Sequence, residues 1–156
     1  MNHTTHTEEF VQKFYTKLGI LKSHQLNFRT IASQLGIQLF YWVDKSQALF
    51  LKDCAYIFLN EKLMKQQLWQ DFCHELAHVL LHTGNQSHMS PLFLEYQENK
   101  ANNFMYHACV PTFMLDEIDA SNLTVEYVQQ QFNVEPDFAL KRLEQYNSKR
   151  LYSELE

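Results

Sequence analysis

The spacing of apolar side chains along the chain predicts helices on either side of a small sheet. Over residues 7–18 and again over residues 27–35, apolar positions recur at the three- and four-residue spacing of one helical face. Gly19 and Gly36 follow these segments, as helix-ending residues do. Three short runs rich in aromatic and β-branched residues come next, over residues 37–43, 48–51 and 55–59. Because only short turn segments separate them, we expect two hairpins and an antiparallel meander.

The rest of the chain is predicted to be helical. A long helix is expected over residues 63–82 and another over residues 92–109, where Pro111 follows as a stop. Two shorter helices are expected over residues 125–132 and 136–146, and the charged end of the chain is expected to fray. The pattern therefore predicts an α+β fold that is mainly helical, with a small three-stranded antiparallel sheet.

One segment of the long helix carries metal-binding chemistry. His74, Glu75 and His78 form the pattern H-E-x-x-H within an almost wholly apolar stretch. Four residues advance slightly more than one helical turn, so both imidazoles project from one face and can fill two corners of a tetrahedral zinc site. Glu75 is rotated by about 100° from His74, so it can accept a proton from a water on the metal. We therefore expect Zn2+ here, with two histidine ligands and Glu75 as general base.

Glu98 is the expected third ligand. On the helix predicted over residues 92–109 it shares a stripe with apolar or small residues only. An ionised carboxylate on an inward stripe is costly unless it meets a cation. Asn102 lies one turn later on nearly the same face, where its amide can hold a ligand in place. Glu95 is the nearest rival, but its stripe is more polar, so we expect it at the surface.

Three further histidines compete for roles near the metal. His82 comes four residues after His78, but by then the helix has turned about 80° away from His74, so we expect a supporting or helix-end role. His88 is expected in a solvated loop. His107 is interpreted as structural, with oxyanion stabilisation as the alternative. Two histidines and a carboxylate suit several divalent ions, and zinc is preferred to manganese only as the commonest choice for this motif.

Composition narrows the class of protein. The chain has 156 residues, 46% of them apolar, which is enough for one core. Lys plus Arg total 13 against 18 Asp plus Glu, so the basic excess typical of nucleic-acid binding is absent. The three cysteines show no C-x-x-C spacing, which favours a reducing compartment. The first residues lack a signal-peptide pattern and no apolar run is long enough to span a bilayer, so a cytoplasmic protein without membrane contact is expected.

These motifs, in this order, resemble the ImmA/IrrE family of metallopeptidases. The matching segments cover most of the chain, at residues 31–37, 57–60, 74–82, 98–111 and 132–143. The resemblance implies a zincin-like fold, zinc ligands at His74, His78 and Glu98, and catalytic Glu75. Residues 105–109 depart from the family pattern, which is more aliphatic and alanine-rich. The lining of the site is therefore expected to differ from that of the family. We expect a single domain over residues 1–156, with N-terminal helices in 1–36, a catalytic core in 37–118 and C-terminal helices in 119–156.

The resemblance also implies a role. Similar proteins are cytoplasmic proteases, often encoded on phages or mobile elements, and many cleave a helix-turn-helix transcriptional repressor and so derepress its genes. A peptide substrate would reach the metal as an extended strand, and residues 48–51 are the candidate strand for pairing with it. One alternative is a regulatory module that binds a repressor without cutting it, although a structural metal site needs no general base. Another is direct DNA binding through residues 125–146, whose charge balance is acidic.

Overall fold

The computed structural model describes residues 4–81 and 90–155, with side chains described through residue 151. The chain divides into two compact units. Asn27–Met105 forms the central unit, and Met1–Leu26 together with Tyr106–Glu156 forms the terminal unit. The single-domain organisation expected from the sequence stays a prediction. Within the described part of the chain, no helix has both the length and the apolar character that crossing a membrane requires.

The central unit contains a three-stranded sheet of mixed direction. Its strands are β1 (Gln38–Trp42), β2 (Gln47–Leu51) and β3 (Cys54–Asn60), in the spatial order β1-β3-β2. β2 pairs antiparallel with β3, whereas β1 pairs parallel with it. The mainly helical α+β fold is confirmed, and the wholly antiparallel meander predicted from the sequence is wrong.

The turns explain this topology. Lys52 and Asp53 alone connect β2 to β3, and both have positive φ angles, of 50° and 65°, as tight hairpin turns require. Residues 43–46 instead lead from β1 to β2 without a direct hairpin, so β1 is free to pair with the other side of β3. The pairing continues one residue beyond the end of β3, because the Glu61 N–H donates to the carbonyl of Trp42 in β1. Short spacing between two strands therefore does not ensure that they are neighbours.

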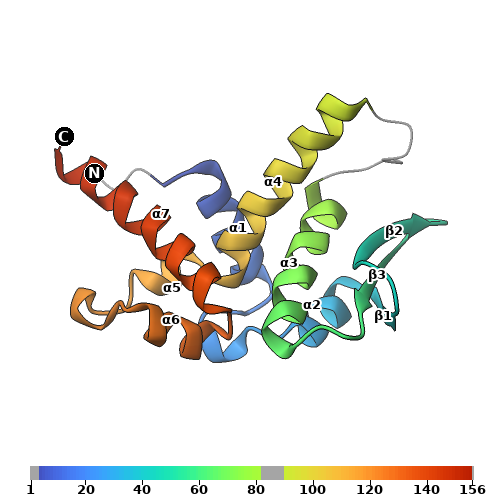
Figure 1. The fold of residues 1–156 in the computed structure, drawn as a ribbon, viewed down its shortest axis with the longest axis horizontal. Helices are drawn as coiled ribbons and strands as arrows, with labels where there is room; N and C mark the ends of the chain where they lie inside the picture. The colour runs from blue at the N-terminus through green and yellow to red at the C-terminus, as the bar shows by residue number, and fades with distance from the viewer. Residues whose placement is uncertain (1–3, 82–89, 156) are drawn as a thin grey trace. The chain divides into compact units, whose positions relative to one another are not determined.

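Two helices of the central unit pack on one face of this sheet (Figure 1). α3 (Lys65–Leu81) packs against β3 and β2, and α2 (Phe28–Leu35) packs against β1 and α3. Ile57 and Leu59 of β3 are fully buried beneath them. The Asn27 side chain caps α2 by accepting two backbone N–H groups, and Gly36 ends it in the left-handed region at φ 70°. This packing fixes the helix that carries the H-E-x-x-H pattern.

The helix α4 (Pro91–Cys109) carries Glu98. Its buried stripe consists of Gln97, Ala101, Phe104 and Ala108, at helical spacing. Glu98 lies beside that stripe, with 45% of its side chain exposed. Glu98 was predicted to lie within the inward stripe, and the structure instead places Gln97, one position earlier, in that stripe. The carboxylate is therefore at the edge of the packed face, where an ion can reach it.

The terminal unit is helical in its described residues. It contains α1 (His6–Lys17), α5 (Thr112–Leu115), α6 (Val125–Phe132), α7 (Pro136–Leu155) and the short 3-10 turns η1 (Ser23–Gln25) and η3 (Ala120–Asn122). α7 continues to Leu155, so the predicted end at residue 146 is wrong. No Gly or Pro interrupts residues 147–155, and Lys149 is held by an ion pair to Glu8 of α1. That long-range contact was not visible in the local charge pattern.

Candidate metal centre

Three predicted ligands meet between α3 and α4 within the central unit. The His74 Nε2 lies 3.0 Å from Glu98 Oε2, and the His78 Nε2 lies 3.0 Å from Glu98 Oε1. One ligand atom from each of the three residues lies within 4.8 Å of the others. Across residues 4–81 and 90–151 this is the one group of three or more such side chains placed to hold a metal. The structure therefore brings together the residues that the sequence singled out as ligands.

The distances from each histidine to Glu98 are close to those between the ligands of a tetrahedral ion. Bonds of about 2.0–2.1 Å to nitrogen and oxygen imply ligand atoms about 3.3 Å apart, close to the distances between each imidazole and Glu98. The side chains of His74 and His78 are 19% and 10% exposed, and that of Glu98 is more open. Two imidazoles and one carboxylate leave a fourth position for water or substrate, as catalytic zinc sites do. The residues present thus fit a divalent metal, and they match the donor set common for zinc.

Glu75 is buried beside these ligands, with 8% of its surface exposed. Burial raises the pKa of its carboxyl group to about 8, and the negative charges of Glu98 and Asp71 act in the same direction. A hydrogen bond from the main-chain N–H of Ala48 acts against them. The described surroundings of Glu75 thus disfavour its ionised form when no cation lies beside it.

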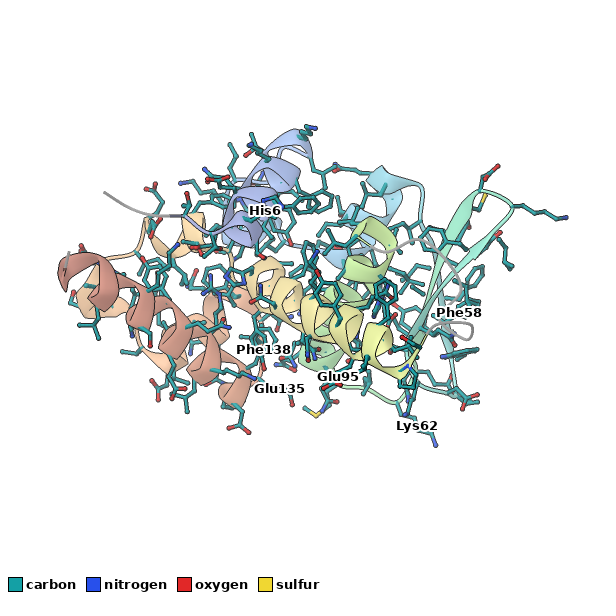
Figure 2. The ribbon with its side chains drawn as sticks, turned by 90° about the horizontal axis from the view of Figure 1, so that it is seen from above. His6, Phe58, Lys62, Glu95, Glu135 and Phe138 are labelled. Atoms are coloured by element: carbon teal, nitrogen blue, oxygen red, sulfur yellow. The ribbon has the colours of Figure 1, made fainter. Side chains whose placement is uncertain are left out.

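The remaining candidates lie elsewhere. Glu95 is exposed on α4 and is not among the clustered ligands, as expected (Figure 2). Asn102 is also exposed, and its supporting role stays a prediction. His107 is buried, with 8% exposure, and both its structural interpretation and the oxyanion alternative stay predictions. His82 and His88 lie outside the described residues.

The contact between β2 and Glu75 was not predicted from the sequence, although residues 48–51 were expected to pair with a substrate. Ala48 supplies a main-chain N–H to Glu75, and an alanine in a strand carries no side-chain signal of such a contact. The only available clue was the position of residues 48–51 in a strand with a free edge. Backbone groups at an active site become visible only once strand register and helix packing are known.

Comparison with known proteins identifies relatives of this chain. The family model described as Peptidase_M78, IrrE N-terminal-like domain, matches residues 32–144, a span that includes the whole H-E-x-x-H pattern and Glu98. The chain is similar to the phage-like element PBSX protein XkdA of Bacillus subtilis, with 38% identity over 153 residues, covering 96% of this chain and 77% of that protein. It is also similar to the uncharacterized protein YqaB of Bacillus subtilis, with 34% identity over 148 residues, covering 93% of this chain and 86% of the relative.

The breadth of these matches decides the family. The family model covers well over half of the chain, and both relatives align along nearly all of it. The resemblance inferred from the sequence is thereby confirmed, and the cluster of two histidines and a glutamate is a possible metal site consistent with it. The chain belongs to the Peptidase_M78 (IrrE N-terminal-like) family of metallopeptidases.

Proposed function

We propose that this chain is a zinc-dependent endopeptidase in which His74, His78 and Glu98 hold the metal and Glu75 is the general base. The observation that carries the proposal is the convergence of both Nε2 atoms on one carboxylate, 3.0 Å each, beside a second, buried carboxyl group. A purely structural metal site does not need a buried carboxylate that is not itself a ligand. Here one carboxylate is placed to bind and the other is buried next to the ligands.

The proposed mechanism divides the work among these side chains. A bound Zn2+ would supply Lewis acidity, lowering the pKa of a coordinated water to roughly 7 and polarising the peptide carbonyl. His74 and His78 are held on one face of α3, so their orientation is set by the helix. Glu75 takes a proton from the attacking water and returns it to the leaving amine. Its burial keeps bulk water from competing for that proton.

The proposed substrate is a helix-turn-helix repressor, whose cleavage would derepress phage or mobile-element genes. The family assignment and the similarity to a protein of a phage-like element support this choice. A protein substrate must present an extended segment, and β2 is an edge strand packed against α3. We propose that this segment pairs with the open edge of β2, adding a strand to the sheet. The protein would act in the cytoplasm, where such a repressor is found.

The test is a cleavage assay with the repressor encoded beside the gene. Purified protein is incubated with it, with and without added zinc, and Glu75→Gln serves as the control. We expect metal-dependent cleavage that the variant loses. Binding without cleavage under every metal condition would instead support a regulatory module that binds the repressor without cutting it. Salt-dependent binding of the protein to DNA would support the DNA-binding alternative. Manganese in place of zinc tests the identity of the metal.

A further inference from the structure

We propose that the main-chain N–H of Ala48, on the edge strand β2, is a positioning group for the Glu75 carboxylate. This inference rests on the proposed function, because it assigns a role within that reaction. It adds a part of the site that no side chain in the sequence reveals. The same strand would then both receive the substrate and hold the base.

Strand register determines which way the Ala48 N–H points. Leu51 and Cys54 flank a two-residue turn, so they form a hydrogen-bonded pair. Hydrogen-bonded pairs alternate with non-hydrogen-bonded pairs in an antiparallel ladder, so the Leu49–Tyr56 pair is bonded and the Ala48–Ile57 pair is not. The N–H groups of Ala48 and Phe50 therefore point away from β3. Because β2 is the last of the described strands on that side, they point away from the other strands of the sheet.

Helix packing brings a carboxylate to one of these two N–H groups. α3 packs against β2, and Ala48 shares a sheet face with the fully buried Ile57. The small Ala48 side chain lets the helix approach the strand closely. Glu75, on α3, accepts the Ala48 N–H while being almost wholly buried. Phe50, two residues on, is exposed, and its N–H points outward from the same edge.

The consequence is geometric. A carboxylate on a helix can rotate about its side-chain torsions, and a proton-transfer group loses rate steeply when misplaced by about 1 Å. A donor fixed in the sheet removes that freedom by holding one carboxylate oxygen, which leaves the other for the proton. Because a paired substrate strand would take its register from the same edge, base and scissile bond would be aligned by one element.

Amide hydrogen exchange tests the contact in the metal-free protein. Exchange is followed by NMR for Ala48 and Phe50, two outward-pointing amides of the same strand. We expect the Ala48 amide to be protected at least about ten-fold more than the Phe50 amide in the native protein, and this difference to disappear in Glu75→Leu, which keeps the burial but removes the acceptor. Equal protection of the two amides, or protection of Ala48 that survives in Glu75→Leu, would overturn the proposal.

Kinetics with the repressor test the role. Ala48→Pro removes the N–H at a position outside the β2–β3 ladder, where an edge strand tolerates proline. We expect kcat to fall about 10- to 100-fold with KM changed less than about three-fold and metal content unchanged. Phe50→Pro, in contrast, removes an outward N–H that does not meet Glu75 and should raise KM. Native kcat in a folded Ala48→Pro variant would contradict the positioning role.

The two tests separate this inference from the proposed function. If the native protein does not cleave the repressor, the proposed function fails, while the exchange measurement still decides whether Ala48 holds Glu75. If cleavage occurs and the exchange difference is absent, the peptidase assignment stands and the positioning role is wrong. Should Ala48→Pro fail to fold, the comparison of native protein with Glu75→Leu decides the question alone.

Discussion

Glu8 of the terminal unit and Glu75 of the central unit are buried to nearly the same extent, with 6% and 8% exposure, yet their carboxyl groups are shifted in opposite directions. Burial by itself raises the pKa of both. At Glu8, hydrogen bonds from Lys149, Thr112 and Thr5 outweigh burial and lower the pKa to about 2. At Glu75, the nearby carboxylates add to the effect of burial, and the pKa rises to about 8.

The difference lies in what each carboxylate meets inside the protein. Glu8 also completes a capping box at the start of α1 and lies in the field of Arg142, which is 1% exposed. Arg142 in turn donates to the Val110 carbonyl and the Thr112 hydroxyl. The charges of Glu8, Lys149 and Arg142 compensate one another, so we interpret these residues as structural. In the central unit, Glu75 lies in the field of the Glu98 and Asp71 carboxylates. Such repulsion is costly unless a cation binds beside them.

The largest expected effect tests the functional side of this comparison. Glu75→Gln should lower kcat by about 10²- to 10⁴-fold, because it removes the proton acceptor. Metal content should stay at the native value, since Glu75 is not among the three clustered ligands. In the metal-free protein the free energy of unfolding should not fall, because the charge removed is one that the site disfavours. Native-like cleavage by the variant would take the base role away from Glu75.

The second prediction concerns the affinity for metal and tests Glu98 as a ligand. Glu98→Gln should weaken zinc binding by at least about 10²-fold, because it replaces an anionic ligand that both histidines face. Glu95→Gln is the matched control on the same helix, and its affinity should be native, since Glu95 is exposed and outside the cluster. Isothermal titration of the metal-free proteins measures both. Equal losses of zinc affinity in the two variants would show a general effect of negative charge and would contradict Glu98 as a ligand.

The third prediction concerns the free energy of unfolding and tests the structural role of Glu8. Glu8→Gln should lower the free energy of unfolding at pH 7 by about 1–3 kcal/mol, because it removes the charge that meets Lys149 and Arg142. The folded-state pKa of Glu8 is below its ordinary value of 4.5, so its contribution is full above about pH 4.5 and is lost as the pH falls towards about 2. Urea unfolding across this range should give a flatter acid limb for the variant.

Its control is Glu9→Gln, the exposed neighbour in the same helical turn. That change should stay within about 0.5 kcal/mol of the native protein. Metal affinity should be native in both variants, since neither residue belongs to the clustered ligands. A loss of metal binding in Glu8→Gln would break the distinction between the two carboxylates.

The smallest expected effect concerns Asn102. A residue that supports a metal ligand typically contributes 10- to 100-fold to affinity. Because the Asn102 side chain is exposed, we expect Asn102→Ala to weaken zinc binding by about ten-fold, at the lower end of that range. Asn103→Ala, also exposed on α4, is the matched comparison and should bind zinc as the native protein does. Native affinity in Asn102→Ala would limit the site to its three clustered residues.

Several elements could be predicted because their signals are local. The helix predicted over residues 125–132 agrees with α6 (Val125–Phe132), which Thr124 caps and Asn133 ends in the left-handed region. The end of α7 was predicted wrongly, because the pairing of Lys149 with Glu8 links residues 141 positions apart. Charged residues near a chain end look solvated in the sequence, and only packing shows that one of them has a buried partner.

The sequence by itself determined the helical pattern, the two histidines one turn apart and the choice of Glu98 as the candidate carboxylate. The helices and the histidine spacing follow from the local period of the helix, whereas Glu98 lies at the edge of the packed face and not in the inward stripe by which it was chosen. Only the tertiary structure decided that β1 joins the far side of β3, that Glu8 is compensated and Glu75 is not, and that a main-chain N–H of β2 meets the base. Strand order, the partners of buried charges and the direction of backbone groups depend on residues distant in the chain, so no local pattern records them.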